Sequence, residues 1–211
     1  PLYSSAASDV YKRQIIHCAG ITTEEQLPYV DFEEFCSVLK PKVLGIYNLD
    51  RATRNDKLDF FISFSSISAI IGDYCRGSYS VANKFLDEFT LYREKLVKKG
   101  LRFGHTISVN WPVWQDGGMD VVDEERIIYE EYLKQAKMPT TVALKVLENV
   151  LASNKSNLLV VYGEAQKIKE LVMKNNSEKN VLLIDNDSDT SIEPVQAVSY
   201  THLRAHETGA Y

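Results

Sequence analysis

The sequence predicts an α/β fold built on a doubly wound parallel sheet. Four short apolar runs are separated by longer segments whose apolar residues have helical spacing. Runs of this kind are typical of parallel strands that are buried on both faces. Strands that alternate with helices form one sheet through right-handed crossovers. Ligands of such sheets bind at the carboxyl ends of the strands, so we expect the chemistry in the loops that follow them.

The four apolar runs are the predicted strands. They comprise Gln14–Cys18, Asp59–Phe64, His105–Asn110 and Asn157–Tyr162. After the first run, Asp31–Leu39 predicts a short helix capped by Asp31, and Pro41 predicts the start of a second helix that ends near Thr53.

A long amphipathic helix is predicted over Ser78–Lys99. Its apolar positions have the spacing of one buried face, and they are Ala82, Phe85, Leu86, Phe89, Leu96 and Val97. Lys98, Lys99 and Gly100 supply a cationic last turn and a left-handed cap. Thr140–Ala152 and Glu164–Met173 are further predicted helices.

The two ends of the chain share no pattern with the segment between them. We expect residues 1–13 and 197–211 to be adapter-like sequence or disordered tails, so the histidines at 202 and 206 are not interpreted as metal ligands. Residues 176–196 are polar and acidic and predict a linker. Residues 14–175 remain as the folded part.

Composition narrows the class of protein. The chain has 211 residues, of which 45% are hydrophobic and 25% charged, as expected for one globular domain. A net charge of −5 argues against a nucleic-acid partner, and no apolar run approaches the ~20 residues of a membrane helix. The three cysteines, Cys18, Cys36 and Cys75, are scattered and predict reduced thiols in a cytoplasmic protein without a metal site.

The candidate catalytic residues surround Tyr79. Ser66 ends the second predicted strand, Tyr79 opens the long helix, and Asn83 follows on the same helical face. Carbonyl reduction needs a proton donor and a hydrogen-bond donor for the developing oxyanion. Tyrosine can supply the proton when a cation lowers its pKa from about 10, and serine can supply the hydrogen bond.

The stretch FISFSSISAIIGDYCRGSYSVANKFLDEF resembles short-chain dehydrogenase/reductases, and among them the ketoreductase domains of modular polyketide synthases. Those domains have Tyr-x-x-x-Asn on the helix and their lysine earlier, which here correspond to Tyr79, Asn83 and Lys42 in LKPKVLGIYNLDRAT. The resemblance implies a Rossmann-like domain with Tyr79 as proton donor and Ser66 as carbonyl anchor. It also implies that Lys42 binds the ribose and lowers the pKa of Tyr79, and that Asn83 orders a water relay.

Two further stretches resemble the cofactor-binding loops of the same family. IIHCAGI is similar to the turn beside the adenosine ribose, which implies contacts from His17, Cys18, Ala19 and Gly20. SVNWPVWQDGGM is similar to the loop beside the nicotinamide, and there the implied residues are Asn110, Trp111, Pro112 and Val113. Trp111 and Trp114 are equally compatible with a role in the core. Residues 116–137 are expected to form a mobile lid over the acyl chain.

The glycine-rich phosphate loop, G-x-G-x-x-G, is absent from the sequence. The resemblance therefore covers only the C-terminal portion of a catalytic domain. It implies NADPH-dependent reduction of a β-ketoacyl thioester on an acyl carrier protein, in polyketide or related fatty acid synthesis, beside adjacent synthase domains. The alternatives are a stand-alone reductase of a free small molecule and a non-catalytic structural half-domain. We expect residues 1–211 alone to be insoluble or molten and inactive.

Overall fold

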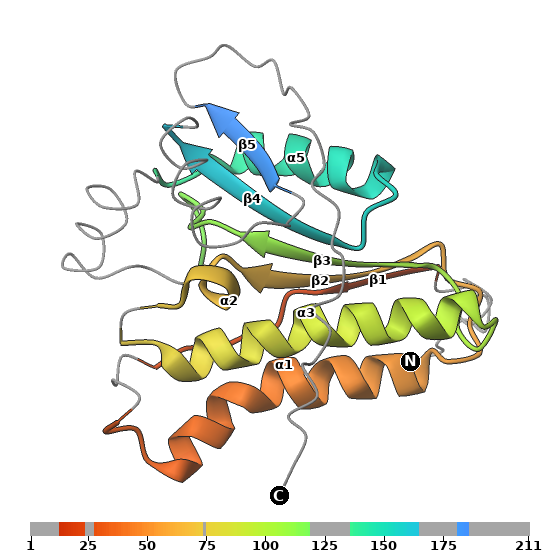
Figure 1. Cartoon of the computed structure of the whole chain (residues 1–211), viewed down its shortest axis with the longest axis horizontal. Helices are drawn as coiled ribbons and strands as arrows, with labels where there is room; N and C mark the ends of the chain where they lie inside the picture. Colours follow the sequence, from red (N-terminus) through yellow and green to blue (C-terminus); the bar gives the residue numbers. More distant parts are fainter. Residues whose placement is uncertain (1–12, 24–27, 74, 119–135, 165–180, 186–211) are drawn as a thin grey trace, which may run out of the picture.

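The structure, a computed structural model, describes residues 13–23, 28–73, 75–118 and 136–164, and the backbone of 181–185. Within these ranges, five strands form one parallel sheet in the order β1-β2-β3-β4-β5 (Figure 1). They are β1 (Gln14–His17), β2 (Phe60–Ser66), β3 (His105–Trp111), β4 (Asn157–Gly163) and β5 (Val181–Asp185). The predicted α/β class with a parallel sheet is confirmed, and each of the four predicted strands is present with its ends shifted by two residues at most.

Strand β5 lies inside the range 176–196, for which the sequence predicted a polar linker. It pairs in parallel with β4 from Leu159↔Val181 to Gly163↔Asp185. The linker prediction therefore does not hold for these five residues. A run of four apolar residues is too short to distinguish a strand by its pattern, and β4 supplies the backbone partners that make it one.

Four helices accompany the sheet in the described ranges: α1 (Phe32–Ala52), α2 (Ser68–Ile71), α3 (Gly77–Lys98) and α5 (Thr140–Ala152). The α5 bounds are those predicted, whereas the short α2 was not predicted. The two helices predicted on either side of Pro41 are one continuous helix. Proline removes one backbone hydrogen bond, but α1 buries residues at four-residue intervals across it, namely Val38, Lys42, Ile46 and Asp50. Packing of this stripe keeps the helix continuous.

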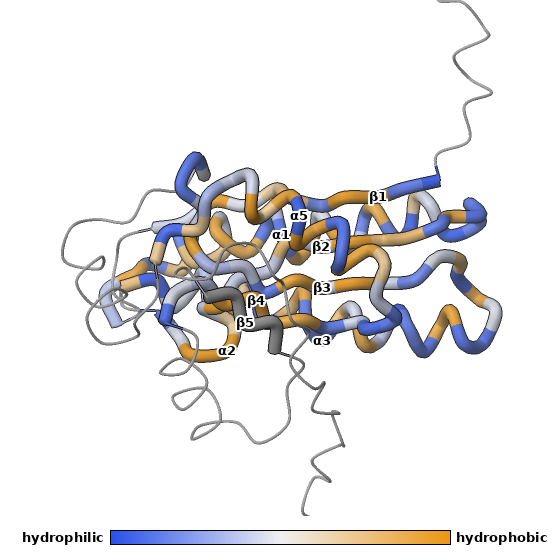
Figure 2. The backbone as a smooth tube through the Cα atoms, turned by 90° about the horizontal axis from the view of Figure 1, so that it is seen from above, coloured by the Kyte–Doolittle hydropathy of each residue, from blue (hydrophilic) through white to orange (hydrophobic). Residues whose placement is uncertain are grey.

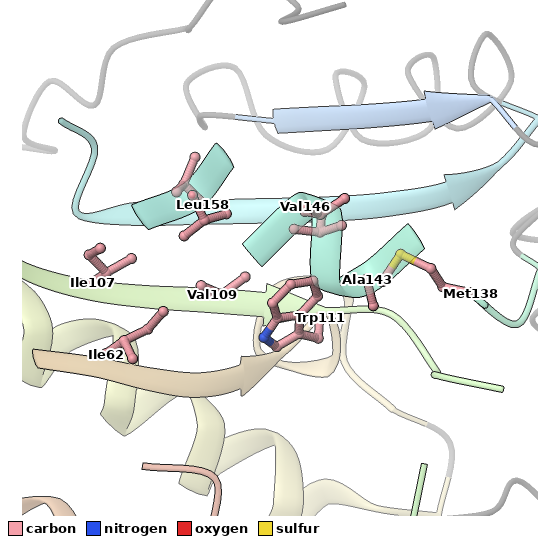
Figure 3. Close-up of a cluster of buried hydrophobic side chains, with 10 residues drawn as sticks. Ile62, Ile107, Val109, Trp111, Met138, Ala143, Val146 and Leu158 are labelled. Atoms are coloured by element: carbon pink, nitrogen blue, oxygen red, sulfur yellow. The ribbon is translucent and has the colours of Figure 1, made fainter. Parts of the chain in front are cut away.

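The helices cover both faces of the sheet, because alternate residues of a strand point to opposite faces. On one face, Ile62 of β2 and Ile107 and Val109 of β3 share a core cluster with Ala143, Val146 and Val150 of α5. Figure 3 shows Ala143 and Val146 beside Val109 and Trp111 in this cluster. On the other face, Phe61 of β2 packs with Ile46 of α1 and with Leu86 and Phe89 of α3. Figure 2 shows the hydrophobic stretches along β1, β2 and β3.

The buried face of α3 is only partly the apolar face predicted. Phe85 is 37% exposed, and Leu96 and Val97 are only partly buried. Five polar residues are also buried: Ser78, Asn83, Asp87, Thr90 and Arg93. Two of them bind a polar stripe of the sheet, because Ser108 donates to Asp87 and Arg93 donates to Thr106. Apolar periodicity does not detect a buried polar stripe of this kind.

A buried ion pair ties the two helices of this face together. Arg93 of α3 donates from Nε to the Asp50 carboxylate of α1 at 2.9 Å, and its side chain is fully buried. The guanidinium also lies 4.4 Å from the centroid of the Phe61 ring. Arg102 binds the other oxygen of Asp50 at 2.9 Å. The helices that carry Lys42 and Tyr79 are therefore fixed to each other.

Several predictions fall on residues outside the described ranges. These are the tails, the helix after Glu164, most of the 116–137 lid and the remainder of the linker. Among the described helices, none has the length and apolar character required to cross a membrane. In the same part of the chain, no cluster of histidine, cysteine and acidic side chains is arranged to hold a metal ion.

Candidate active site

A cavity of about 400 Å³ opens at the carboxyl ends of β1, β2 and β3. This is the edge of a parallel sheet at which ligands bind. The register brings its residues together, because Ser66 at the end of β2 is paired with Trp111 at the end of β3. The lining residues are Cys18, Gly20, Lys42, Phe64, Ser65, Ser66, Ile67, Asp73, Arg76, Tyr79, Trp111, Pro112, Val113, Trp114, Gly117 and Gly118.

Three of the four predicted catalytic residues line this cavity: Lys42, Ser66 and Tyr79. Lys42 is 3% exposed, and its Nζ donates a hydrogen bond of 2.8 Å to the carbonyl oxygen of Phe64. The same Nζ lies 5.6 Å from the centroid of the Tyr79 ring. Residues from α1, β2 and α3 therefore meet at one point, although they are far apart in the sequence.

Burial raises the pKa of Tyr79, while hydrogen bonding with the side chains of Asn83 and Ser66 lowers it by a smaller amount. The net shift is upward, which is opposite to the effect expected from Lys42. The reason is that a phenolate loses more solvation in this buried position than its hydrogen bonds restore. Tyr79 therefore carries its proton at neutral pH, as a proton donor must.

Burial also lowers the pKa of Lys42, to about 8, and the charges of Cys18 and Asp87 oppose this shift. Lys42 in turn acts on its neighbours. Its charge adds to burial in lowering the pKa of His17, and it opposes the upward shift that burial gives the Cys18 thiol. Lys42 is thus a desolvated cation at the base of the cavity.

The fourth predicted catalytic residue, Asn83, is fully buried and does not line the cavity. Its Nδ2 donates to the Tyr79 carbonyl oxygen at 2.9 Å, one helical turn earlier. The backbone carbonyl oxygen of Asn83 accepts a 3.1 Å hydrogen bond from Ser65 Oγ. Its role in a water relay stays a prediction.

Five further residues predicted to bind the cofactor also line the cavity: Cys18, Gly20, Trp111, Pro112 and Val113. His17, Ala19 and Asn110 do not. His17 is 5% exposed and its ring lies against Gly45 of α1, where a β-carbon would be 3.0 Å from Cε1. Asn110 is fully buried under α3, where its Nδ2 donates to Asp87 at 2.9 Å.

Two charged residues of the cavity were not singled out from the sequence. Asp73 and Arg76 lie between β2 and α3, and Arg76 is the N-cap residue of α3. Phe64, Trp111 and Trp114 form an aromatic cluster with ring centroids 5.0 to 6.1 Å apart. In the sequence, the position of Asp73 and Arg76 just before Tyr79 was the one indication that they could belong to the site. Charged residues in a loop are usually solvated, so this indication was weak. Trp111 belongs both to the cavity and to the core, so the two interpretations of its role are compatible.

Comparison with known proteins identifies the family. A sequence model described as "KR domain" matches residues 5–116, a range that begins within the segment expected to be adapter-like. The chain is 36% identical over 174 residues to polyketide synthase PksN of Bacillus subtilis (strain 168), which covers 80% of this chain and 3% of the synthase. It is 36% identical over 155 residues to PksL of the same organism, which covers 74% of this chain and 3% of that synthase.

Solved structures give the same result. A ketoreductase domain from the bacillaene assembly line has a TM-score of 0.71 and 37% identity, covering 76% of this chain and 38% of that chain. An N-terminal ketoreductase from the macrolactin assembly line has a TM-score of 0.66 and 31% identity, covering 76% and 30%. The chain thus spans well under half of these ketoreductases. It belongs to the KR domain family, the ketoreductase domains of polyketide synthases.

Proposed function

We propose that the domain containing this chain reduces a β-ketoacyl thioester, carried on an acyl carrier protein, to the β-hydroxyacyl thioester with NADPH. The observation that carries the proposal is the meeting of Lys42, Ser66 and Tyr79 in one cavity. Membership of the KR domain family supports reduction of a ketone in polyketide synthesis. Adjacent synthase domains and a carrier protein are then the partners.

The residues present fit the nicotinamide end of the cofactor. Gly20, Pro112 and Val113 offer a wall with little side-chain polarity, and Lys42 offers a buried ammonium for ribose hydroxyls. Bound NADPH would supply the hydride. The sequence contains no G-x-G-x-x-G loop for the cofactor phosphates.

The chain's own residues would then control the proton and the carbonyl. Ser66 Oγ would donate a hydrogen bond to the substrate carbonyl oxygen as negative charge develops on it. Tyr79 would donate its phenolic proton to that oxygen, and its raised pKa means that the group is protonated before the transfer. Lys42 would then stabilise the phenolate that remains, since its Nζ is 5.6 Å from the ring centroid.

Replacement of Tyr79 tests the proposal. In the complete domain, Tyr79→Phe removes one hydroxyl and should lower kcat for a β-ketoacyl thioester by at least about 100-fold, the order of general acid catalysis. Tyr92→Phe is the matched control, because Tyr92 lies on the same helix and is 54% exposed. Retention of most activity in Tyr79→Phe would remove this residue from the mechanism. An equal loss of kcat in Tyr79→Phe and Tyr92→Phe would also remove Tyr79 from the mechanism.

We also propose that residues 1–211 alone do not bind NADPH. Among the described residues, β1 pairs with β2 on one side, and Ile16 on this strand is 49% exposed. An apolar strand edge of this kind promotes association between chains. Calorimetric titration of the purified chain with NADPH should give no binding heat, and tight binding would contradict the proposal.

A further inference from the structure

A buried carboxylate lies directly behind the candidate active site. Asp87 of α3 is 2% exposed. Asn110 Nδ2 lies 2.9 Å from each of its carboxylate oxygens, and Ser108 Oγ donates to Oδ1 at 2.7 Å. Both donors belong to β3, so Asp87 fixes α3 to that strand. Burial raises the pKa of this carboxyl, and the hydrogen bonds from Ser108, Asn110 and Ser65 oppose the shift.

The hydrogen bonds continue from Asp87 to the backbone that carries the reacting groups. Asn110 Nδ2 also donates to Ser65 Oγ at 2.9 Å. Ser65 Oγ in turn donates to the carbonyl oxygen of Asn83 at 3.1 Å. The network thus starts on α3, crosses β3 and β2, and returns to α3 one turn earlier. All of its side chains are buried.

Two residues of this network adjoin predicted site residues. Ser65 lines the cavity itself and precedes Ser66, the predicted carbonyl anchor, and Asn110 precedes Trp111. The backbone carbonyl oxygen of Asn83 accepts from Ser65, and the Asn83 side chain donates to the backbone carbonyl oxygen of Tyr79. The spacing between Ser66 on β2 and Tyr79 on α3 therefore depends on the hydrogen bonds that join β2, β3 and α3.

We propose that Asp87 is a positioning residue for the reduction, which acts through Asn110 and Ser65 to set the distance between Ser66 and Tyr79. This inference rests on the proposed function. Asp87 does not line the cavity and acts through its neighbours. An error of about 1 Å in the placement of reacting groups lowers a rate about 100-fold, so a small movement of α3 is sufficient to matter.

A role in packing alone predicts a different result. Because burial raises the pKa of Asp87, its ionised form is disfavoured in the folded protein. Asp87→Asn keeps the volume, but its NH2 takes the place of a carboxylate oxygen that accepts from Asn110 Nδ2, so the hydrogen-bond network is interrupted without leaving a cavity and kcat should decline more than the melting temperature does. A residue retained for packing would instead lose stability, and its activity would decline only as stability declines.

The experiment uses the complete ketoreductase domain with Asp87→Asn, Ser65→Ala and the double variant. Thr90→Val is the matched control, because Thr90 is buried on the same helix and its hydroxyl has no hydrogen-bond partner among the described residues. Melting temperature, kcat and KM for a β-ketoacyl thioester are measured for each. We expect both single variants to lower kcat at least about tenfold with KM changed less than about threefold. The double variant should be no slower than the slower single one, because both substitutions interrupt one path.

Several results would overturn the inference. One is a kcat of Asp87→Asn within about twofold of the wild type, and another is a loss of kcat that follows a loss of melting temperature. Independent, multiplied losses in the double variant would also count against a shared path. If Asp87→Asn does not fold, Ser65→Ala decides by the same criteria. An active wild type with an unaffected Asp87→Asn refutes only this inference, whereas an inactive wild type refutes the proposed function as well.

Discussion

The buried ion pair between α1 and α3 gives the sharpest prediction about stability. Asp50→Ala removes the carboxylate that pairs with Arg93, whose side chain is fully buried, and with Arg102, whose side chain is 20% exposed. Arg102 can regain water after the change. Arg93 cannot, so its positive charge would remain buried without a counterion.

The expected loss in free energy of unfolding depends on the contacts that Arg93 keeps after the substitution. Its Nη atoms still donate to Thr106 Oγ1 at 2.8 Å and to the Phe103 carbonyl oxygen at 3.0 Å, and the guanidinium still lies over Phe61. These contacts hold the group in place, but none neutralises its charge. Removal of one partner of a buried ion pair costs about 3–5 kcal/mol in free energy of unfolding, so we expect Asp50→Ala to fall in that range.

The assay is urea denaturation of the complete domain, followed by tryptophan fluorescence and circular dichroism. Asp59→Ala is the control, because the Asp59–Arg13 ion pair has a similar length, 2.8 Å against 2.9 Å, but its side chains are 42% and 65% exposed. Removal of an exposed ion pair costs at most about 1 kcal/mol. Arg93→Met in the Asp50→Ala background should restore part of the stability, because the uncompensated charge is then gone.

The reasoning would be refuted if Asp50→Ala cost no more than Asp59→Ala. It would be refuted equally if Arg93→Met made the Asp50→Ala protein still less stable. Either result would mean that water or local rearrangement compensates the Arg93 charge, and that α1 and α3 do not depend on this ion pair for their relative position.

Three other predictions follow from single groups. Burial lowers the pKa of Lys42 to about 8, so kcat/KM should decline above that pH, and a profile that stays flat through this range would contradict its role as a cation. The hydrogen bond that His105 donates to the Glu94 carboxylate raises the pKa of His105 above 6.5, so the stabilisation it gives should be full below pH 6.5 and lost as the pH rises through the folded-state pKa. Denaturation in a pH series should show this slope in the wild type and not in Glu94→Gln. Gly104→Ala should lower the melting temperature more than Gly100→Ala, because both have positive φ, 81° and 70°, but only at Gly104 would a β-carbon lie 2.9 Å from a backbone carbonyl oxygen.

The sequence determined four of the five described strands and the candidate site residues. Each predicted strand is a short run of apolar residues between helical patterns, and burial on both faces of a parallel sheet requires that pattern. Tyr79 and Ser66 were identified from their order and spacing, and the same residues line the cavity. Lys42 was identified from a resemblance, because nothing in the spacing along the chain connects it with Tyr79.

The tertiary structure decided the features that depend on partners far away in the sequence. Pro41 predicted a helix boundary, yet burial of Val38 and Lys42 on one side of α1 keeps the helix continuous. Val181–Asp185 was part of a predicted linker, yet pairing with β4 makes it a strand. In both cases the local pattern was ambiguous and distant contacts contributed the deciding energy.

The polar layer under α3 shows this limit most clearly. Asn110 was predicted to flank the nicotinamide, because it ends a strand in a stretch similar to a cofactor loop, but its side chain points to the other side and binds Asp87. A sequence shows which residues are polar, and it does not show which of two faces of a strand end is covered by a helix. The sequence by itself thus determined most of the elements and the candidate site residues, whereas the packing of α1 and α3 on the sheet decided which of these residues line the cavity and which lie behind it.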